Sequence, residues 1–228
     1  MDNITNGFFG ALELILSGNR EVYGIIGLSL VVSFVSVIIS MFFSVPLGIV
    51  IGMNRFPFRK AVIMIINTLM GLPPVIAGLV VYLLLSRSGP LGYLRMLHTP
   101  QAMVIAQVLL VSPIIIGVTL AGVKDRGNLI QKTAFTLGAN RCQALWTIIK
   151  ECRTSIGASL VAGYGRAISE VGAVMLVGGN IKGHTRVMTT AIVLETNMGN
   201  FDQAIAIGIV LLVLFFILNI LLQKYQGA

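Results

Sequence analysis

The sequence is poor in charged residues, which make up only 11% of its 228 positions. Soluble domains carry about 25% Asp, Glu, Lys and Arg, because polar groups must cover their surface. This chain is instead 56% hydrophobic, and its mean hydropathy is +0.94. The shortage of charge excludes an ordinary soluble protein and predicts an integral membrane protein with one domain.

Acidic residues are the scarcest charged type, with 8 Asp and Glu against 16 Lys and Arg, and the formal net charge is +8. A nucleic-acid-binding protein would gather such an excess on a solvated face. Here the basic residues stand mostly in short gaps between apolar runs. We therefore expect a lipid bilayer, and no nucleic acid, as a partner of this chain.

Cysteine and histidine are too few and too scattered to build a reactive centre. Cys142 and Cys152 lie ten positions apart without a metal-ligand spacing, and His98 and His184 are isolated. The sequence has no G-x-S-x-G motif and no histidine within an apolar run. We expect no catalytic residue, no metal and no cofactor in this chain, and reduced cysteines that face the cytoplasm.

Long apolar runs predict five membrane spans, since a span needs about 20 predominantly apolar residues. The run at 7–17 is shorter, contains Glu13 and follows no basic segment, so no signal peptide is evident and an interfacial helix is favoured over an additional span. We interpret residues 1–21 as an external segment with an interfacial helix. The predicted spans are Val22–Met53, Ala61–Ser86, Ala102–Val123, Ile156–Gly178 and Gln203–Leu222.

Basic residues are distributed unevenly between the two sets of loops, and the side that is richer in Lys and Arg is expected to be cytoplasmic. This rule places the N-terminus outside and the C-terminus in the cytoplasm, which five spans satisfy. The transmembrane domain is then 22–225, with a cytoplasmic loop at 124–153. One side carries Arg55, Arg59, Lys60, Lys124, Arg126, Lys132, Arg141, Lys150, Arg153 and Lys224, and the other carries Arg20, Arg87, Arg95, Lys182 and Arg186.

Prolines interrupt three of the predicted spans, at Pro46, at Pro73-Pro74 and at Pro113. Each removes an intrahelical hydrogen bond, and broken backbone persists at membrane depth only where protein or a water-filled cavity satisfies it. One interpretation is a transport pathway bordered by these kinks. Ordinary kinked packing explains any single one of them better, and only the three together favour the pathway.

The long cytoplasmic loop is predicted to contain two short helices. Residues 129–150 lack proline and have apolar residues at helical spacing, and Gly138 interrupts them near the middle. We expect the two helices to meet at Gly138-Ala139. Their apolar stripe needs a cover, which is either a partner protein or the surface of the bundle or membrane.

The run Lys132–Ala139 resembles the cytoplasmic E-A-A-x-x-x-G loop of ATP-binding-cassette importer permeases. Lys132 and Thr133 replace the Glu and the first Ala of that motif, and Glu151 stands where most members have proline. The resemblance implies that this loop docks on an ATPase subunit. The residues that match the motif, and that it marks as the ATPase-coupling loop, are Ala134, Leu137, Gly138 and Ala139.

A more specific resemblance covers Gly165–Ile181, which is similar to the pattern R-x-x-(G/S)-E-(F/V)-G-A-x-x-x-x-x-G-N-I of the oxyanion branch of these permeases. The continuation at 190–201 resembles the tungstate permeases most. The resemblance implies an all-α type I permease, like those for molybdate and methionine. It also implies a homodimer, an ATPase dimer that uses ATP and Mg²⁺, an external oxyanion-binding protein, and the inner membrane of a prokaryote.

Two charged residues fall inside the fourth predicted span, where ionisable side chains are costly and mark pathways by default. Arg166 and Glu170 are four residues apart and would share one helix face. They either line or gate an anion path, or form a structural ion pair between spans. The predicted pathway residues are Arg166, Ser169, Glu170, Gly178, Gly179 and Asn180, of which the last three are expected to end the span.

These features favour a non-enzymatic permease subunit of an ATP-driven importer for a tetrahedral oxyanion, with tungstate ahead of molybdate and sulfate. The run Gly178–Thr185 resembles a phosphate-binding P-loop, but His184 replaces the lysine of that motif, so ATP must bind to another chain. A self-contained secondary transporter is less favoured, because such folds show internal repeats and none is visible here.

Overall fold

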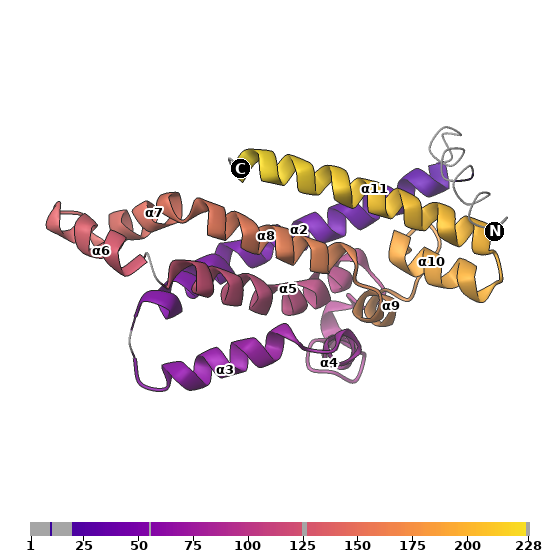
Figure 1. Cartoon of the computed structure of the whole chain (residues 1–228). Coiled ribbons are helices and arrows are strands. Elements are labelled where there is room, and N and C mark those ends of the chain that lie inside the picture. Colours follow the sequence, from indigo (N-terminus) through magenta and orange to yellow (C-terminus); the bar gives the residue numbers. More distant parts are fainter. Residues whose placement is uncertain (1–9, 11–19, 55, 125–126, 227–228) are drawn as a thin grey trace. The chain divides into compact units, whose positions relative to one another are not determined.

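The computed structural model describes residues 10, 20–54, 56–124 and 127–226, with the side chains of 128 and 221–226 left out. In this part of the chain the regular structure is helical and no β-strand occurs (Figure 1). The all-α fold is therefore confirmed. The interfacial helix predicted at 7–17 lies outside the described residues, apart from Gly10.

Three described helices are long and apolar enough to cross a membrane: α2 (Arg20–Met53), α5 (Pro100–Val123) and α11 (Phe201–Gln226). Their bounds agree with three of the predicted spans. Pro46 and Pro113 lie inside α2 and α5. The expectation that prolines interrupt these two spans is wrong, because both helices continue through them.

The other two predicted spans are each an interrupted pair of shorter helices. These pairs are α3 (Arg59–Met70) with α4 (Pro74–Leu85), and α8 (Arg153–Ile168) with α9 (Gly172–Gly178). Counting each pair as one span gives the five that were predicted. We call residues 71–73 the proline break and residues 169–171 the polar break.

The chain divides into two compact units, each made of segments that are distant in sequence. Unit 1 contains 1–36, 73–107 and 167–220, and unit 2 contains 37–72, 108–166 and 221–228.

Within unit 1, α4 packs closely on α9 (Figure 1). A Cβ atom at Gly78 would lie 2.6 Å from the Cα atom of Ala173, so the contact requires glycine. A second cluster joins α10 (Met188–Asn197) to α11, where the buried Met188 packs with Ala206 and Val210. These contacts hold the segment around α9 in place.

Within unit 2, small residues of α2 face the second half of α5. A Cβ atom at Gly48 would lie 2.9 Å from the carbonyl oxygen of Ile116. The side chain of Arg59 donates from Nε to the carbonyl oxygen of Ile51 and from Nη2 to that of Gly52, both at 2.9 Å. These bonds satisfy carbonyls at the end of α2, which have no partner within the helix.

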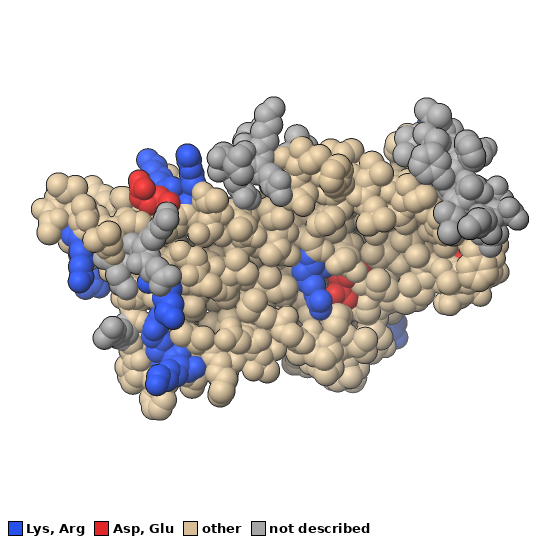
Figure 2. All heavy atoms as spheres, in the orientation of Figure 1, with Lys and Arg blue, Asp and Glu red and all other residues tan. Residues whose placement is uncertain are grey.

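The outer surface is largely apolar, as a surface in contact with lipid must be. Exposed large side chains include Phe42, Leu212 and Phe216, which are 72%, 69% and 65% accessible. Figure 2 shows that most of one face carries neither acidic nor basic side chains. The shortage of charge in the sequence therefore corresponds to a surface that water would not solvate well.

Candidate translocation gate and coupling hairpin

The polar break begins where α8 ends at Ile168, and α9 starts only at Gly172. Glu170 is buried, with 4% of its surface accessible. Its Oε1 atom accepts a hydrogen bond from the backbone N–H of Ala173 at 3.1 Å, so this carboxylate caps the first turn of α9. A negative charge is also favourable at this end of a helix.

This arrangement corrects the prediction that Arg166 and Glu170 lie in one continuous helix. Arg166 lies in the last turn of α8 and is partly exposed, whereas Glu170 follows the end of that helix. Ser169, inside the break, is exposed.

Side chains from two other helices satisfy the carbonyl groups at the polar break. Gln107, in the first half of α5, donates from Nε2 to the carbonyl oxygen of Ala167 at 3.0 Å. Thr189, in α10, donates from Oγ1 to the carbonyl oxygen of Glu170 at 2.8 Å. All three bonds at the polar break are buried, where an unsatisfied polar group would be costly.

Sequence reasoning missed both of these residues. Gln107 carries a signal that could have found it, because it is the one amide side chain in the apolar run Ala102–Val123. Polar residues at membrane depth usually face other protein groups. Thr189 carries no such signal, since threonine is common near helix starts and Thr190 stands beside it.

The end of α9 at Gly178 confirms the predicted end of the fourth span. Gly179 and Asn180 follow with φ of 74° and 50°, in the left-handed region. Gly179 also touches the ring of His98, whose Nδ1 atom would lie 2.8 Å from a Cβ atom at this position. Both its conformation and this close approach require glycine here.

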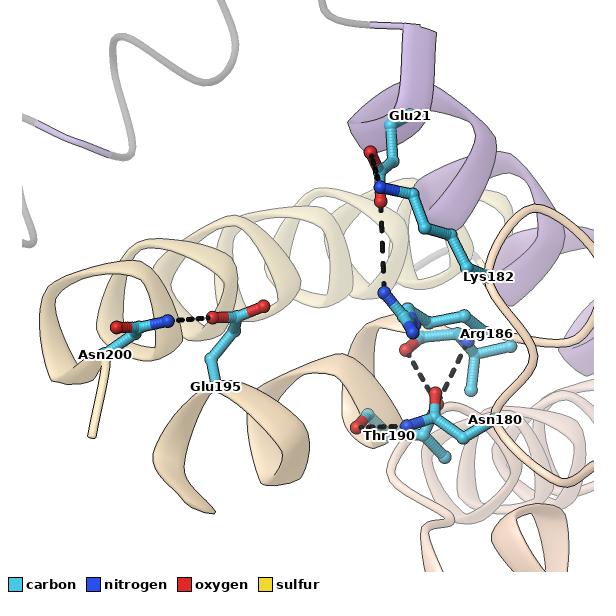
Figure 3. Close-up of polar contacts among 8 residues, drawn as sticks. Glu21, Asn180, Lys182, Arg186, Thr190, Glu195 and Asn200 are labelled. Carbon is cyan, nitrogen blue, oxygen red and sulfur yellow. Dashed lines mark hydrogen bonds and ion pairs between the residues drawn. The ribbon is translucent and has the colours of Figure 1, made fainter. Parts of the chain in front are cut away.

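Thr185 closes the turn that follows α9. Its buried Oγ1 atom donates to the carbonyl oxygen of Gly178 at 2.6 Å and accepts from the backbone N–H of Ile181 at 3.0 Å. The P-loop-like run is thus a closed turn held by its own threonine. Asn180 contacts the start of α10, where its Nδ2 atom donates to the carbonyl oxygen of Thr190 at 3.4 Å (Figure 3).

Two basic side chains of the same segment are held by an acidic one at the start of α2. Lys182 Nζ lies 2.8 Å from Glu21 Oε2, and Arg186 Nη1 lies 3.8 Å from Glu21 Oε1. Figure 3 shows both side chains turned toward Glu21. The single carboxylate of Glu21 therefore offsets about half of their combined positive charge within unit 1.

The predicted coupling loop forms a helical hairpin of α6 (Gly127–Thr136) and α7 (Arg141–Glu151), as expected (Figure 1). Gly138 has φ of 81°, and the backbone N–H of Ala139 donates to the carbonyl oxygen of Ala134 at 3.0 Å, which is a Schellman-type end of α6. Asn140 and Gln143 then form a capping box that starts α7.

The four predicted coupling residues differ in exposure. Leu137 is 82% accessible at the tip of the hairpin and Gly138 is exposed, whereas Ala134 is buried and Ala139 is half-buried. Space around Gly138 is open, so its left-handed backbone is what requires glycine. Leu129, Phe135, Leu137 and Trp146 are exposed and leave an apolar surface on the hairpin.

Comparison with known protein families identifies the family of this chain. Residues 44–226 match the family described as binding-protein-dependent transport system inner membrane component. The chain belongs to this family. The resemblance inferred from its motifs is thereby confirmed, and the chain is a multi-pass membrane protein of the ABC permease class.

Individual relatives cover almost the whole chain. It is 46% identical over 226 residues to the tungstate uptake system permease protein of Peptoclostridium acidaminophilum, with 99% of each chain covered. It is 39% identical to a probable anion ABC transporter permease protein of Haloferax volcanii, covering 89% of both chains. It is 34% identical to the tungstate uptake system permease protein of Campylobacter jejuni, covering 99% of this chain and 95% of the relative.

Proposed function

We propose that this chain is the transmembrane permease subunit of an ATP-driven importer for a tetrahedral oxyanion, and that its cargo is tungstate. The observation that carries the proposal is the near-full-length similarity to two permeases named for tungstate uptake. The chain itself hydrolyses no ATP. Its partners are a second copy of itself, an ATPase dimer that binds ATP and Mg²⁺, and an external oxyanion-binding protein.

In this proposal the permease lies in the inner membrane of a prokaryote, with its N-terminus outside and its C-terminus in the cytoplasm. The anion passes along the polar break and the turn after α9. Conduction requires binding that is favourable enough to admit an ion and weak enough to release it. The residues proposed to line or gate this path are Arg166, Ser169, Glu170, Gly178, Gly179 and Asn180.

The polar break suits a gate because side chains, rather than the covalent structure of proline, hold it in its present form. Each of its three side-chain bonds contributes about 0.5–3 kcal/mol, depending on whether a charged group takes part. Exchanging these bonds would switch the backbone between two arrangements. A moving element in a transporter needs a small difference in free energy between its two conformations, and a few hydrogen bonds are of that size.

The hairpin of α6 and α7 is proposed to dock on the ATPase subunit and to transmit the conformational change that ATP hydrolysis drives. Its exposed tip, with Leu137 and the glycine turn, offers an apolar surface that a groove on an ATPase subunit would cover. The left-handed turn at Gly138 fixes the angle between the two helices, and this stiffness would transmit a movement to α8, which begins two residues after α7.

Reconstitution tests the proposed function. The chain, co-expressed with its ATPase and its binding protein and placed in liposomes, should import tungstate only when ATP and the binding protein are both present. Competition among tungstate, molybdate and sulfate then identifies the cargo. Import without ATP would indicate a secondary transporter, and preference for another oxyanion would refute tungstate.

A matched pair of variants tests the coupling hairpin in the same liposomes. Leu137→Asp should reduce the ATP hydrolysis that the permease supports, because it places a charge where an apolar contact is proposed. Phe58→Asp is the control, since Phe58 is 81% accessible in another loop on the predicted cytoplasmic side. Equal effects of the two substitutions would argue against a specific docking role for the hairpin.

A further inference from the structure

A hollow of about 1110 Å³ lies beside the loop that joins α4 to α5, at residues 86–99. Its lining includes three basic side chains, Arg87, Arg95 and His98, together with the phenol groups of Tyr82 and Tyr93. No Asp or Glu is among the described residues that line it. We call it the arginine hollow.

The basic side chains of the arginine hollow are not neutralised within the part of the chain that the structure describes. Arg87 and Arg95 are exposed and form no ion pair with any described carboxylate. Lys182 and Arg186 differ in this respect, because Glu21 holds both of them (Figure 3). A concave surface lined by one sign of charge focuses the electric field and concentrates counter-ions.

Two left-handed residues and several backbone hydrogen bonds shape the loop around the hollow. Arg95 and His98 have φ of 51° and 61°, a left-handed conformation that costs non-glycine residues free energy and clusters at functional sites. Backbone bonds close the loop, from Leu91 N–H to the carbonyl oxygen of Leu84 at 2.9 Å and from Arg95 N–H to that of Gly92 at 3.2 Å. The guanidinium groups are thus carried on a preorganised backbone.

His98 connects the hollow to the turn that ends α9. Its backbone N–H donates to the carbonyl oxygen of Val177 at 2.9 Å, and its ring lies against Gly179. The same histidine lines the arginine hollow. An anion in the hollow would therefore stand next to the turn at Gly178–Asn180 that is proposed to border the pathway.

From these observations we infer that the arginine hollow is a capture site for the tetrahedral oxyanion on the external side, occupied before the anion enters the pathway. Arg87 and Arg95 supply planar pairs of donors that fit oxyanion edges, and the tyrosine hydroxyls can add single bonds. Because both arginines are exposed, salt screens them and the site binds weakly. The hollow is much larger than one oxyanion, so the anion would arrive with part of its hydration.

This inference rests on the proposed function, and it makes a prediction that needs no transport. In the purified complex, tungstate should slow the modification of Arg87 and Arg95 by phenylglyoxal, which mass spectrometry measures at each residue. The rate should fall by about threefold when tungstate is at twice its dissociation constant, since free sites scale as 1/(1 + [L]/Kd). Arg20 is the reference residue, because its side chain is exposed and does not line the arginine hollow.

Sodium chloride at matched ionic strength separates an oxyanion site from general screening, and equal protection by chloride would overturn the inference. Nanodiscs with and without phosphatidylglycerol separate free oxyanion from a lipid phosphate. Protection that requires this lipid and does not respond to tungstate would also overturn it. A wild-type complex that imports no tungstate would refute the proposed function. The protection of Arg87 and Arg95 from phenylglyoxal would still show whether the hollow binds the oxyanion.

A double variant tests the role in transport. Arg87→Gln with Arg95→Gln should lower the tungstate imported per ATP hydrolysed, with an unchanged affinity for the binding protein. The deficit should be smaller at higher salt, because salt already screens the two arginines of the wild type. Lys182→Gln, which removes a cation already paired with Glu21, should leave that ratio within about twofold of wild type, as an exposed pair contributes little. An unchanged ratio in the double variant, or a deficit explained by lost binding-protein affinity, would contradict the assignment.

Discussion

The two interrupted spans are broken by different chemistry. At the proline break, Gly71 and Leu72 close the end of α3 with backbone bonds to Thr68 and Leu69, and Pro74 stands as the first residue of α4. A proline is well tolerated at that position, because its missing N–H would have no partner there. This break follows from local covalent structure alone.

The polar break contains no proline. The helix can end here because side chains form the hydrogen bonds that the backbone groups would otherwise lack. Glu170 caps α9, Gln107 bonds to the carbonyl of Ala167, and Thr189 bonds to that of Glu170. Two of these partners come from other helices. The proline break thus needs no side chain from another helix, whereas the polar break depends on contacts that a conformational change can remove.

The largest effect is expected from Glu170→Ala. This substitution removes the cap of α9 and a buried carboxylate on the proposed path, so ATP-dependent uptake in the reconstituted complex should fall to background. Loss of the cap alone costs about 0.5–2 kcal/mol of stability. Membrane insertion, measured by fractionation, should be unchanged, and normal uptake would refute the role of Glu170.

Glu170→Gln separates the cap from the charge. The amide keeps an oxygen that can accept from Ala173 N–H, so thermal stability should lie closer to wild type than in the alanine variant. Uptake that recovers fully would assign Glu170 a capping role only.

A smaller effect is expected from Gln107→Leu, which leaves the carbonyl of Ala167 without its donor. An unsatisfied buried group costs about 1–3 kcal/mol, so both the thermal stability in detergent and uptake should fall. Thr119→Val is the matched control, because it removes a buried bond of 3.0 Å to Ser159 within unit 2. If both variants lose uptake in proportion to stability, Gln107 has no special role at the polar break.

Thr189→Val should act in the same direction and more weakly. It preserves the shape of the side chain and removes one neutral hydrogen bond, worth about 1 kcal/mol. Initial uptake rates should be reduced, whereas Thr196→Val, at an exposed position of the same helix, should have no effect. Equal rates in the two variants would show that the bond to Glu170 is dispensable.

The smallest effect is expected from Pro74→Ala in the proline break. Alanine also fits the first position of a helix, and Pro73 remains to keep α3 from continuing into α4. Stability should change by less than about 1 kcal/mol, mainly through the unfolded chain. Uptake should stay near wild type, and a large loss would mean that the proline break moves during transport.

The sequence predicted those features that depend on composition and local conformation. Apolar runs located five spans, Gly138 located the turn of the hairpin, and Gly178 located the end of α9. The polar break was not predicted, because Ser169 and Glu170 end a helix only in combination with Gln107 and Thr189. Gln107 lies 60 residues from Ala167 and Thr189 lies 19 residues from Glu170, and hydropathy does not report which side chains meet.

At Pro46 and Pro113 the sequence predicts interruptions that the structure does not contain. A proline in a span predicts an interruption, yet α2 and α5 continue through Pro46 and Pro113. Neighbouring groups can satisfy the backbone at an internal proline in a membrane helix. Packing therefore decides which prolines end a helix, just as packing decides which side chains meet at the polar break.

Cysteine accessibility at the two breaks tests the central claim most directly. In a background without Cys142 and Cys152, Ser169→Cys and Gly71→Cys each place a thiol in one break, at positions that are both exposed. The rate of alkylation is measured in the reconstituted complex without nucleotide and after trapping with ATP and vanadate. The account predicts a change of about tenfold or more at Ser169→Cys, equivalent to about 1.4 kcal/mol between states, and little change at Gly71→Cys. Equal behaviour of the two thiols, or a constant rate at Ser169→Cys, would contradict it.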